Sequence, residues 1–429
     1  MFMRYTNWVL IISSNSINIT KARYIYKTEG KVDTVLEIKK NIYWCGIRDW
    51  GLDVFHGHEL STHRGSSYNS YLIKDKKTVL VDTVWDPYKE EFVENLDKNV
   101  GLSNIDAIVI NHSEPDHGGS LGLLMEKIPN TPIYCTKNGA EIIKKHFGKD
   151  WNFNIVKTGD SLELGEYTLK FVEMQMIHWP DSMLTYVEGA KLVLSNDAFG
   201  QHYCSISMFN DESDQCELYE EAIKYYANIL WPFKPLIKKK IDQILAMNLD
   251  IDMIAPSHGV IWRTNATQIV EKYLDWSDPN YNEGYVTIIY DTMYHATHAM
   301  AQAFGRGLEE EGINYRIFNI ATKDKSDLNV EIFKSSAVLI GSCTVNNTVL
   351  RPTAALLEEL KGLKAKGKLA MGFGSYGWSG EAHKIISEKL KDVGLTVCQE
   401  PIGFRYKPTE EELNQCVEIG RNIAKQLKA

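Results

Sequence analysis

The sequence predicts a two-domain α/β protein. Its 429 residues exceed the roughly 150 to 250 residues of an ordinary large domain. In the first half, short β-branched and apolar runs alternate with segments of helical spacing, which predicts two sheets flanked by helices. After about residue 278 strands and helices alternate strictly, which is typical of a parallel sheet. We therefore expect an N-terminal domain over residues 32–278 and a C-terminal domain over residues 279–429.

Residues 1–31 form an expected N-terminal extension. This stretch is rich in Ser, Asn and Thr, carries several basic residues, and has no acidic residue before Glu29. Such a composition weakly resembles an organelle presequence. An extension without an address function is the preferred interpretation, and the presequence remains the alternative.

Two sets of elements are expected in the N-terminal domain. The strands are 42–45, 70–73, 78–81, 107–110, 168–172, 184–187, 191–195 and 253–256. The helices are 88–98, 120–128 and 139–147, together with a long helical region over 217–247 that Pro232 and Pro235 interrupt.

The C-terminal domain is expected to begin after the break at Trp276–Asn280. The pattern then predicts strand 285–290, helix 297–311, strand 337–341, helix 353–366, strand 368–372 and helix 380–392, with a final helix before the end of the chain. A strand, helix, strand repeat of this kind builds a parallel sheet with helices on its faces.

Composition excludes several classes of protein. Hydrophobic residues make up 44% and charged residues 24%, which are ordinary globular values, and the net charge of −9 disfavours a nucleic-acid partner. The seven cysteines are scattered without a CxxC pair, so neither a disulfide scaffold nor a zinc ribbon is predicted. No apolar run approaches the roughly 18 residues of a membrane span. We expect a soluble protein of a reducing compartment, the cytoplasm.

The residues that carry chemistry form one set of seven. His112, Glu114, Asp116 and His117 lie within the run Asn111–Gly119, and three more follow far downstream: His178, Asp197 and His258. Four imidazoles and three carboxylates without a thiolate suit two iron or manganese ions better than a structural zinc. For the 112–117 cluster alone, a solvated acidic turn is the competing interpretation.

Every member of this set is expected where a strand ends. The cluster follows the strand 107–110, and the three remote residues follow 168–172, 191–195 and 253–256. Strand ends hold side chains on a rigid scaffold while the loops reach a metal. Alternate residues 112, 114 and 116 would converge in an extended or turning loop, and Asp116 and His117 would serve a second ion.

These motifs resemble those of a known family. The pattern is similar to the metallo-β-lactamase fold, whose usual first motif is HxHxDH, but Glu114 stands in place of the second histidine. With His178–Ser182, Ser195–His202 and Ala255–Gly259, the chain resembles the flavodiiron proteins over roughly residues 32–427. The resemblance implies an N-terminal metallo-β-lactamase-like αββα sandwich and a C-terminal flavodoxin-like doubly wound parallel sheet.

The resemblance also assigns roles to the metal-site residues. One iron would take His112, Glu114 and His178, the other Asp116, His117 and His258, with Asp197 as the bridge. By the same resemblance, three neighbours lie close to the iron pair and donate hydrogen bonds or protons: His56, His202 and Tyr226. A simple turn role for His56 and a packing role for Tyr226 are the alternatives.

Three loops of the second domain predict FMN binding. The first, 291–297, places hydroxyls and free N–H groups at a helix start, as phosphate binding requires, but lacks the Walker lysine and the GxGxxG of a dinucleotide fold. It resembles the phosphate loop of flavodoxin, although His295-Ala296 is unusual there. Loops 341–347 and 374–380 follow strands at the same sheet edge, and an aromatic face of Tyr376 or Trp378 would cover the flavin ring. The expected FMN contacts are Thr292, Met293, Tyr294, His295, Ala296, Thr297, Ser342, Cys343, Thr344, Val345, Asn346, Asn347, Ser375, Tyr376, Gly377, Trp378, Ser379 and Gly380.

The expected function is an oxidoreductase that passes electrons through FMN to a diiron site. The family reduces dioxygen to water or nitric oxide to nitrous oxide, and the sequence leaves this choice open. The resemblance implies a head-to-tail homodimer or a homotetramer. Because no paired CxxC module precedes Ala429, an external donor is expected: rubredoxin, an NADH-linked reductase or a reduced deazaflavin.

Two rival interpretations compete with this function. One is a zinc hydrolase of the metallo-β-lactamase fold with a regulatory flavodoxin-like domain, and the other is an electron-transfer flavoprotein whose first domain only docks partners. Glu114 argues against the hydrolase, because hard carboxylates offset the extra charge of an oxidised iron pair. The complete set of seven residues argues against the docking platform.

Overall fold

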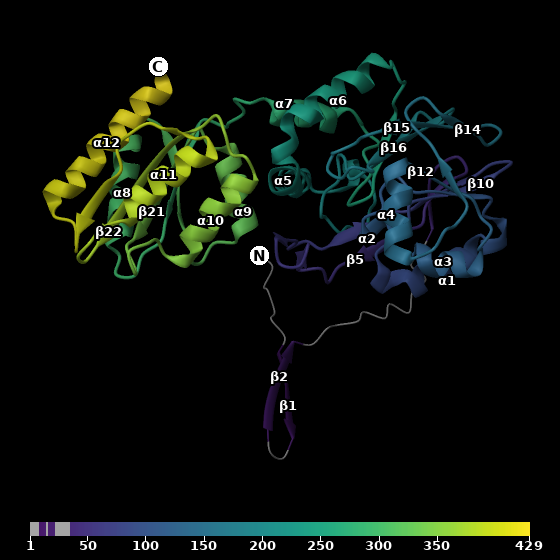
Figure 1. Ribbon diagram of the computed structural model, residues 1–429, viewed down its shortest axis with the longest axis horizontal. Coiled ribbons are helices and arrows are strands. Elements are labelled where there is room, and N and C mark those ends of the chain that lie inside the picture. Colours follow the sequence, from purple (N-terminus) through teal and green to yellow (C-terminus); the bar gives the residue numbers. More distant parts are fainter. Residues whose placement is uncertain (1–7, 14–15, 22–34) are drawn as a thin grey trace.

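Two stacked sheets lie at the centre of the N-terminal domain, and a third sheet forms the C-terminal domain (Figure 1). The structure is a computed structural model that describes residues 8–13, 16–21 and 35–429. Within the expected extension, β1 (Trp8–Ser13) and β2 (Ser16–Lys21) pair antiparallel. The rest of residues 1–31 lies outside the described residues, so the role of this extension stays a prediction.

The first sheet has seven strands in the order β13-β12-β11-β10-β9-β4-β3. The strands from β10 to β13 are parallel and the others antiparallel. Their bounds are β3 (Leu36–Lys39), β4 (Ile42–Trp44), β9 (Tyr71–Lys74), β10 (Thr78–Val81), β11 (Ala107–Val109), β12 (Ile133–Cys135) and β13 (Phe153–Ile155). Between β4 and β9, two short pairs form: β5 (Ile47–Asp49) with β8 (Ser66–Tyr68), and β6 (Val54–Phe55) with β7 (Leu60–Ser61).

The second sheet has the order β14-β15-β16-β17-β18 and is antiparallel except for its last pair. Its strands are β14 (Ser161–Glu163), β15 (Thr168–Glu173), β16 (Met183–Glu188), β17 (Leu192–Asn196) and β18 (Met253–Pro256). The strands predicted at 78–81, 168–172, 184–187, 191–195 and 253–256 are therefore confirmed within one residue at each end.

Apolar side chains divide the N-terminal domain into four layers. Val81 and Val109 of the first sheet share one buried cluster with Phe171 and Leu194 of the second, so the two sheets pack face to face. The opposite face of the first sheet packs against α1 (Lys89–Asn99), α3 (Leu121–Lys127) and α4 (Lys137–Phe147). The opposite face of the second sheet packs against α5 (Gln215–Tyr225), α6 (Lys234–Ala246) and α7 (Gln268–Ser277). This is the predicted αββα sandwich. Three short 3₁₀ turns, η1 (Asp86–Tyr88), η2 (Leu102–Asn104) and η3 (Asn210–Glu212), lie in its loops.

The long helical region predicted over 217–247 is divided into four segments. After α5 comes a π-helical turn, η4 (Tyr226–Leu230), then a 3₁₀ turn, η5 (Trp231–Phe233), and then α6. Pro232 and Pro235 each stand in the first two positions of a segment, where a missing N–H costs nothing. The prolines therefore start new helical segments, as their positions predicted.

The C-terminal sheet is entirely parallel, as the strict alternation predicted. Its order is β20-β19-β21-β22-β23, and β24 also pairs with β22. The strands are β19 (Tyr285–Tyr290), β20 (Asn314–Asn319), β21 (Ala337–Cys343), β22 (Leu369–Tyr376), β23 (Thr396–Val397) and β24 (Ile402–Arg405). The sequence interpretation missed β20 and the helix after it, because their mixed composition lacks a clear apolar period.

Helices cover both faces of this sheet, which makes it doubly wound. Ile288 shares a cluster with Phe304 of α8 (Ala296–Glu310) and Ile423 of α12 (Glu410–Lys428). The next residue, Ile289, points to the other face. That face is covered by α9 (Lys325–Lys334), α10 (Arg351–Gly362) and α11 (Ala382–Val393). α8 and α12 cross closely, because a Cβ on Gly307 would lie 2.0 Å from the Val417 carbonyl oxygen.

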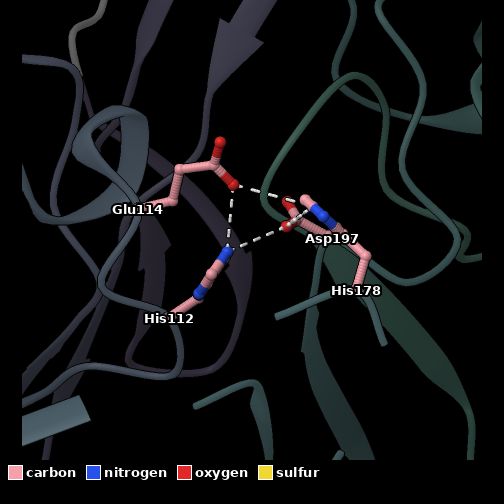
Figure 2. A group of neighbouring side chains, drawn as sticks. All are labelled: His112, Glu114, His178 and Asp197. Carbon is pink, nitrogen blue, oxygen red and sulfur yellow. Dashed lines mark hydrogen bonds and ion pairs between the residues drawn. The ribbon is translucent and has the colours of Figure 1, made fainter. Parts of the chain in front are cut away.

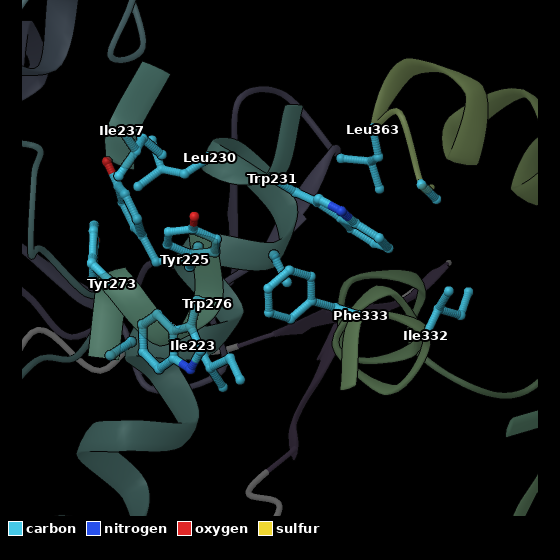
Figure 3. Close-up of a cluster of buried hydrophobic side chains, with 14 of the residues drawn as sticks. Ile223, Tyr225, Leu230, Trp231, Ile237, Tyr273, Trp276, Ile332, Phe333 and Leu363 are labelled. Carbon is cyan, nitrogen blue, oxygen red and sulfur yellow. The ribbon is translucent and has the colours of Figure 1, made fainter. Parts of the chain in front are cut away.

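The two domains share one apolar seam. Trp231 of η5 packs edge-on against Phe333 of α9 with ring centroids 5.0 Å apart, and Leu363 lies beside them (Figure 3). Polar contacts flank this seam: Ser61 Oγ donates to Asp324 Oδ1 at 2.8 Å. The predicted boundary near residue 278 falls between the end of α7 at Ser277 and the start of β19. The domain limits themselves stay a prediction.

All seven cysteines are free thiols. Among the described residues, no helix combines the length and the apolar character that crossing a membrane requires.

Candidate metal centre

The cluster His112–His117 begins just beyond the end of β11. The Asn111 N–H donates to Asp82 Oδ1 at 2.7 Å and fixes the chain as it leaves the sheet. An extended or turning loop was expected here, but residues 115–118 form one helical turn, α2 (Pro115–Gly118). Pro115 stands at the start of this turn, where its fixed φ favours a helix. The turn keeps Glu114 apart from Asp116 and His117, so that they serve different groups.

The three remote residues also leave strands, as predicted. His178 lies in the loop between β15 and β16, Asp197 directly follows β17, and His258 lies two residues beyond β18. The pairing of β17 with β18 shifts register between Leu194 and Asn196, immediately before Asp197. All three belong to the second sheet, whereas the cluster belongs to the first. The centre therefore lies at one edge of the sandwich, with donors from both sheets.

The first group of donors contains His112, Glu114, His178 and Asp197 (Figure 2). His112 Nε2 lies 3.1 Å from Glu114 Oε2, and His178 Nε2 lies 3.2 Å from Asp197 Oδ2. One donor atom from each residue lies within 4.8 Å of all the others, a spacing that one ion can span. These four side chains include all three residues that the family resemblance assigned to the first ion.

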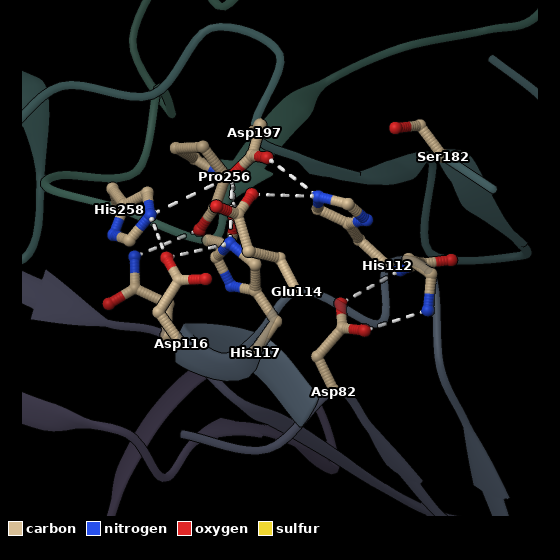
Figure 4. A network of polar contacts seen from close by, with 12 residues as sticks. Asp82, His112, Glu114, Asp116, His117, Ser182, Asp197, Pro256 and His258 are labelled. Atoms are coloured by element: carbon tan, nitrogen blue, oxygen red, sulfur yellow. Dashed lines mark hydrogen bonds and ion pairs between the residues drawn. The ribbon is translucent and has the colours of Figure 1, made fainter. Parts of the chain in front are cut away.

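The second group contains Asp116, His117 and His258 (Figure 4). Asp116 Oδ2 lies 3.1 Å from His117 Nε2 and 3.0 Å from His258 Nε2. Asp197 reaches this group too, because its Oδ1 is 2.9 Å from His117 Nε2 while its Oδ2 faces the first group. The two oxygens of one carboxylate thus face different groups, which is the geometry expected of a bridge.

The buried, charged side chains around Asp197 would be destabilising without a bound cation. Burial would raise the pKa of the Asp197 carboxyl, but the surrounding imidazoles, His117 first, hold it well below its usual range. Asp116 Oδ1 is buried without a hydrogen-bond partner. Asp197 Oδ2 and His117 Nε2 are also buried, and they lie within ion-pair distance of other members of the set without forming a hydrogen bond. Such orphaned acceptors and ring nitrogens are costly unless a cation satisfies them. The donor set therefore fits a pair of metal ions.

The three loops expected to bind FMN meet at one edge of the C-terminal sheet. β19, β21 and β22 are neighbours, so the loops that follow them lie side by side. Thr297 Oγ1 and Ser375 Oγ share a hydrogen bond of 2.9 Å, and the Thr344 N–H donates to the Ser375 carbonyl at 2.8 Å. These contacts join the first loop to the third and the second to the third.

The exposed and unsatisfied groups of this edge fit a bound flavin. Thr292 Oγ1 is buried without a hydrogen-bond partner, as a phosphate-binding hydroxyl would be before its ligand arrives. The side chains of Tyr294 and Trp378 are 87% and 84% exposed, which leaves their aromatic faces free for a planar ring. Tyr376 instead stacks on His383 with ring centroids 6.3 Å apart, so Trp378 is the better candidate to cover the isoalloxazine.

Comparisons with known proteins agree with both halves of the molecule. Residues 67–259 match the family model described as ODP family beta lactamase, and residues 288–420 match the flavodoxin model. The chain is 50% identical over 393 residues to proteins of Escherichia coli called anaerobic nitric oxide reductase flavorubredoxin, covering 91% of this chain and 82% of theirs. The chain belongs to the flavodiiron protein family.

Solved structures support the same assignment. Rubredoxin oxygen:oxidoreductase from Desulfovibrio gigas is 34% identical, with a TM-score of 0.89 over 92% of this chain and 98% of that one. The flavodiiron protein from Giardia intestinalis is also 34% identical, with a TM-score of 0.88 over 92% and 97%. The predicted family, fold class and oxidoreductase activity are confirmed, and the zinc-hydrolase alternative is not favoured.

One residue of this flavodiiron centre escaped the sequence interpretation. Asp181 accepts hydrogen bonds from His112 Nδ1 at 3.1 Å and from the Ser113 N–H at 2.7 Å. Burial opposes its ionisation, but His112 and Ser113 hold the pKa of Asp181 below its usual value. The carboxylate fixes the His112 proton on Nδ1 and leaves Nε2 for a metal. Its position three residues after His178 was the available signal.

His56 and His202 lie where the resemblance placed them, beside the ligand-type residues. His56 Nε2 is 3.2 Å from Glu114 Oε1, and the ring of His202 lies 4.8 Å from that of His258. Ser66 Oγ is 2.8 Å from His202 Nδ1, while His202 Nε2 has no partner. Both histidines can therefore exchange hydrogen bonds with a guest at the centre, and their catalytic roles stay predictions.

Tyr226 does not lie with this group. Its hydroxyl shares a hydrogen bond of 2.8 Å with Ser277 Oγ, and its ring packs on Tyr273 and Phe333 in the seam. The preceding residue, Tyr225, occupies the expected place, with its ring 5.3 Å from that of His202. The π-helical turn begins at Tyr226, and a one-residue ambiguity between adjacent tyrosines cannot be settled by sequence spacing in such a turn.

Proposed function

We infer that this flavodiiron protein holds two iron ions and one FMN per chain and reduces a diatomic gas. The inference depends on one observation: the two carboxylate oxygens of Asp197 face two separate groups of histidine and carboxylate side chains. One ion would be held by His112, Glu114 and His178, the other by Asp116, His117 and His258. The irons and the flavin supply reversible one-electron and two-electron chemistry when bound.

The chain's own side chains would prepare the site for that chemistry. Asp181 and the Ser67 carbonyl orient His112 and His258 through their Nδ1 atoms, so both rings present Nε2 to a metal. His56, His202 and Tyr225 surround the donor atoms and would supply hydrogen bonds and protons to the guest. In the second domain, Thr292, Tyr294 and Thr297 would hold the FMN phosphate.

Nitric oxide is the favoured substrate, with dioxygen as the second candidate. The 50% identical relatives are named as nitric oxide reductases, whereas the Desulfovibrio gigas protein, at 34% identity, is named as an oxygen oxidoreductase. Reduction of two nitric oxide molecules to nitrous oxide and water consumes two electrons and two protons. Reduction of dioxygen to two waters consumes four of each.

The electron donor and the assembly are also proposed. The names of these relatives contain rubredoxin, which favours a rubredoxin-type donor over an NADH-linked reductase or a reduced deazaflavin. Large apolar side chains are exposed on both domains, including Trp50 and Ile206 on the first and Tyr294, Trp378 and Tyr406 on the second. Their mutual burial would favour a head-to-tail homodimer or a homotetramer built from such dimers. Seven free thiols suit a reducing cytoplasm.

One experiment tests the proposal. The purified protein is analysed for iron, zinc and flavin, reduced anaerobically, and then mixed with separate pulses of nitric oxide and dioxygen. We expect about two irons and one FMN per chain and flavin reoxidation far faster than that of free FMN. Two zinc ions per chain, or reoxidation no faster than free FMN by either gas, would contradict it.

A further inference from the structure

A pocket of about 250 Å³ opens between the two domains of the chain. Three segments that are distant in sequence line it: the turn between β6 and β7, the π-helical turn η4, and the end of α10 in the flavodoxin-like domain. A water molecule takes up about 30 Å³ of liquid, so the pocket is roomy for a small guest. Neither the metal centre nor the FMN loops account for it.

One residue, His56, lies between this pocket and the metal centre. His56 lines the pocket, and its Nε2 lies 3.2 Å from Glu114 Oε1. Of the seven ligand-type side chains, Glu114 and His178 are each 11% exposed, while the other five are at most 5% exposed. The centre is therefore least covered at Glu114 and His178, and the pocket adjoins it on the Glu114 side through His56.

The walls of the pocket suit a neutral guest. Leu60, Ile229 and Leu363 contribute apolar surface. The two carboxylates at the pocket already have partners: Glu59 pairs with Lys325 Nζ at 2.9 Å, and Glu359 accepts from Asn329 Nδ2 at 2.7 Å. With its charges satisfied, the pocket offers nothing to hold an ion, but it can hold a small molecule of low polarity.

We propose that a neutral diatomic substrate docks in this pocket and enters the metal centre from it. The pocket is lined by His56, Leu60, Ile229 and Leu363, and His56 separates it from the metal centre. The proposal rests on the gas-reducing function proposed above. It assigns a substrate route to the seam between the domains, where the flavodoxin-like domain contributes α10 as a wall in addition to its flavin.

Gly362 offers a clean way to close this route. It ends α10, it lines the pocket, and a Cβ built on it meets nothing within 4 Å. Gly362→Trp should therefore place a bulky ring at the mouth of the pocket without a clash at Cβ. Ile229→Phe fills it from the opposite wall and serves if the first variant folds poorly. Glu358→Trp is the matched control, because it adds the same ring to the same helix at a side chain that is 70% exposed.

The measurement is the rate of flavin reoxidation in the anaerobically reduced holoenzyme over a series of nitric oxide or dioxygen concentrations. For Gly362→Trp and Ile229→Phe we expect the apparent second-order rate constant to fall several-fold. The limiting rate at saturating gas, the rate of flavin reduction and the EPR spectrum of the iron pair should match the parent. Pressurised xenon should occupy the pocket in crystals of the parent and be absent from Gly362→Trp.

Other outcomes overturn the proposal. Unchanged second-order rates in both filled variants, or an equal loss in Glu358→Trp, would rule out this entry site. An altered EPR spectrum with a lower limiting rate would instead mean that the substitutions disturb the metal ligands. If the parent itself failed to react with either gas, the proposed function would fail, an outcome distinct from these.

Discussion

Lys224 Nζ donates a hydrogen bond to Asp327 Oδ1 across the seam between the domains, at 2.7 Å. The lysine side chain is only 6% exposed and comes from α5, while the aspartate comes from α9 and is 32% exposed. A buried ammonium needs a partner of opposite charge. This ion pair therefore fixes how the flavodoxin-like domain rests on the metal domain.

Asp327→Asn should loosen this seam. The substitution leaves the Lys224 ammonium buried beside a weaker acceptor, and because Asp327 is partly solvated we expect a loss of about 1–2 kcal/mol in the free energy of unfolding. Thermal unfolding followed by calorimetry measures it. Lys323→Met is the control, because Lys323 is 35% exposed and 3.5 Å from the same carboxylate, so its loss should change little.

Asp181→Asn should weaken iron binding without changing any direct ligand. The amide no longer attracts the His112 Nδ1 proton as a carboxylate does, so the ring is less firmly held with Nε2 toward the metal. Losses of this kind are about 10- to 100-fold in metal affinity. Competition with a chelator measures the change, and Asp150→Asn, at a side chain 82% exposed, is the control. Parent-like affinity in Asp181→Asn would mean that the hydrogen bond does not orient the ligand.

The buried amine of Lys368 should make the free energy of unfolding increase between neutral and alkaline pH. Burial lowers the pKa of its amine from 10.5 to about 7, with a further contribution from Lys234. The folded state then binds fewer protons than the unfolded state between pH 7 and 10.5, so the free energy of unfolding contributed by this amine rises with pH across that window. Urea unfolding at a series of pH values should show a shallower rise in Lys368→Met. Lys361→Met, at a side chain 59% exposed, should keep the parent slope.

Tyr226→Phe should affect stability but not catalysis. It removes the hydrogen bond to Ser277 Oγ and leaves that hydroxyl buried, at a cost of about 1–2 kcal/mol. Because the ring packs in the seam away from the donor atoms, gas-reduction rates should stay at the parent value. Stopped-flow reoxidation together with thermal unfolding tests both halves. A large loss of turnover in a stable Tyr226→Phe variant would restore the role that the sequence resemblance gave this residue.

The sequence predicted the ligand-type residues of the metal centre better than it predicted the residues and elements that surround them. Residues such as His112 and Asp197 stand out because several donor types recur at the ends of apolar strands, and strand ends converge in space. The signal for Asp181 was weak, because it was only a position three residues after His178, and an aspartate beside a proline in a loop is also an ordinary turn residue. β20 was missed because its residues are half-buried at a sheet edge, so the alternation of apolar and polar side chains is weak there. The interdomain pocket could not be foreseen, since it depends on how two domains meet.

The end of α5 carries two neighbouring residues with different partners. Lys224 contacts α9 of the other domain, and Tyr225 packs against the rings of His202 and His258. Inserting one residue upstream would rotate this end of the helix by about 100° and turn both side chains away from their partners together. The contact between the two domains and the packing around the candidate metal centre therefore both depend on the rotational position of the same helix. We expect length changes in α5 to be absent among functional homologues, even where its surface residues vary freely.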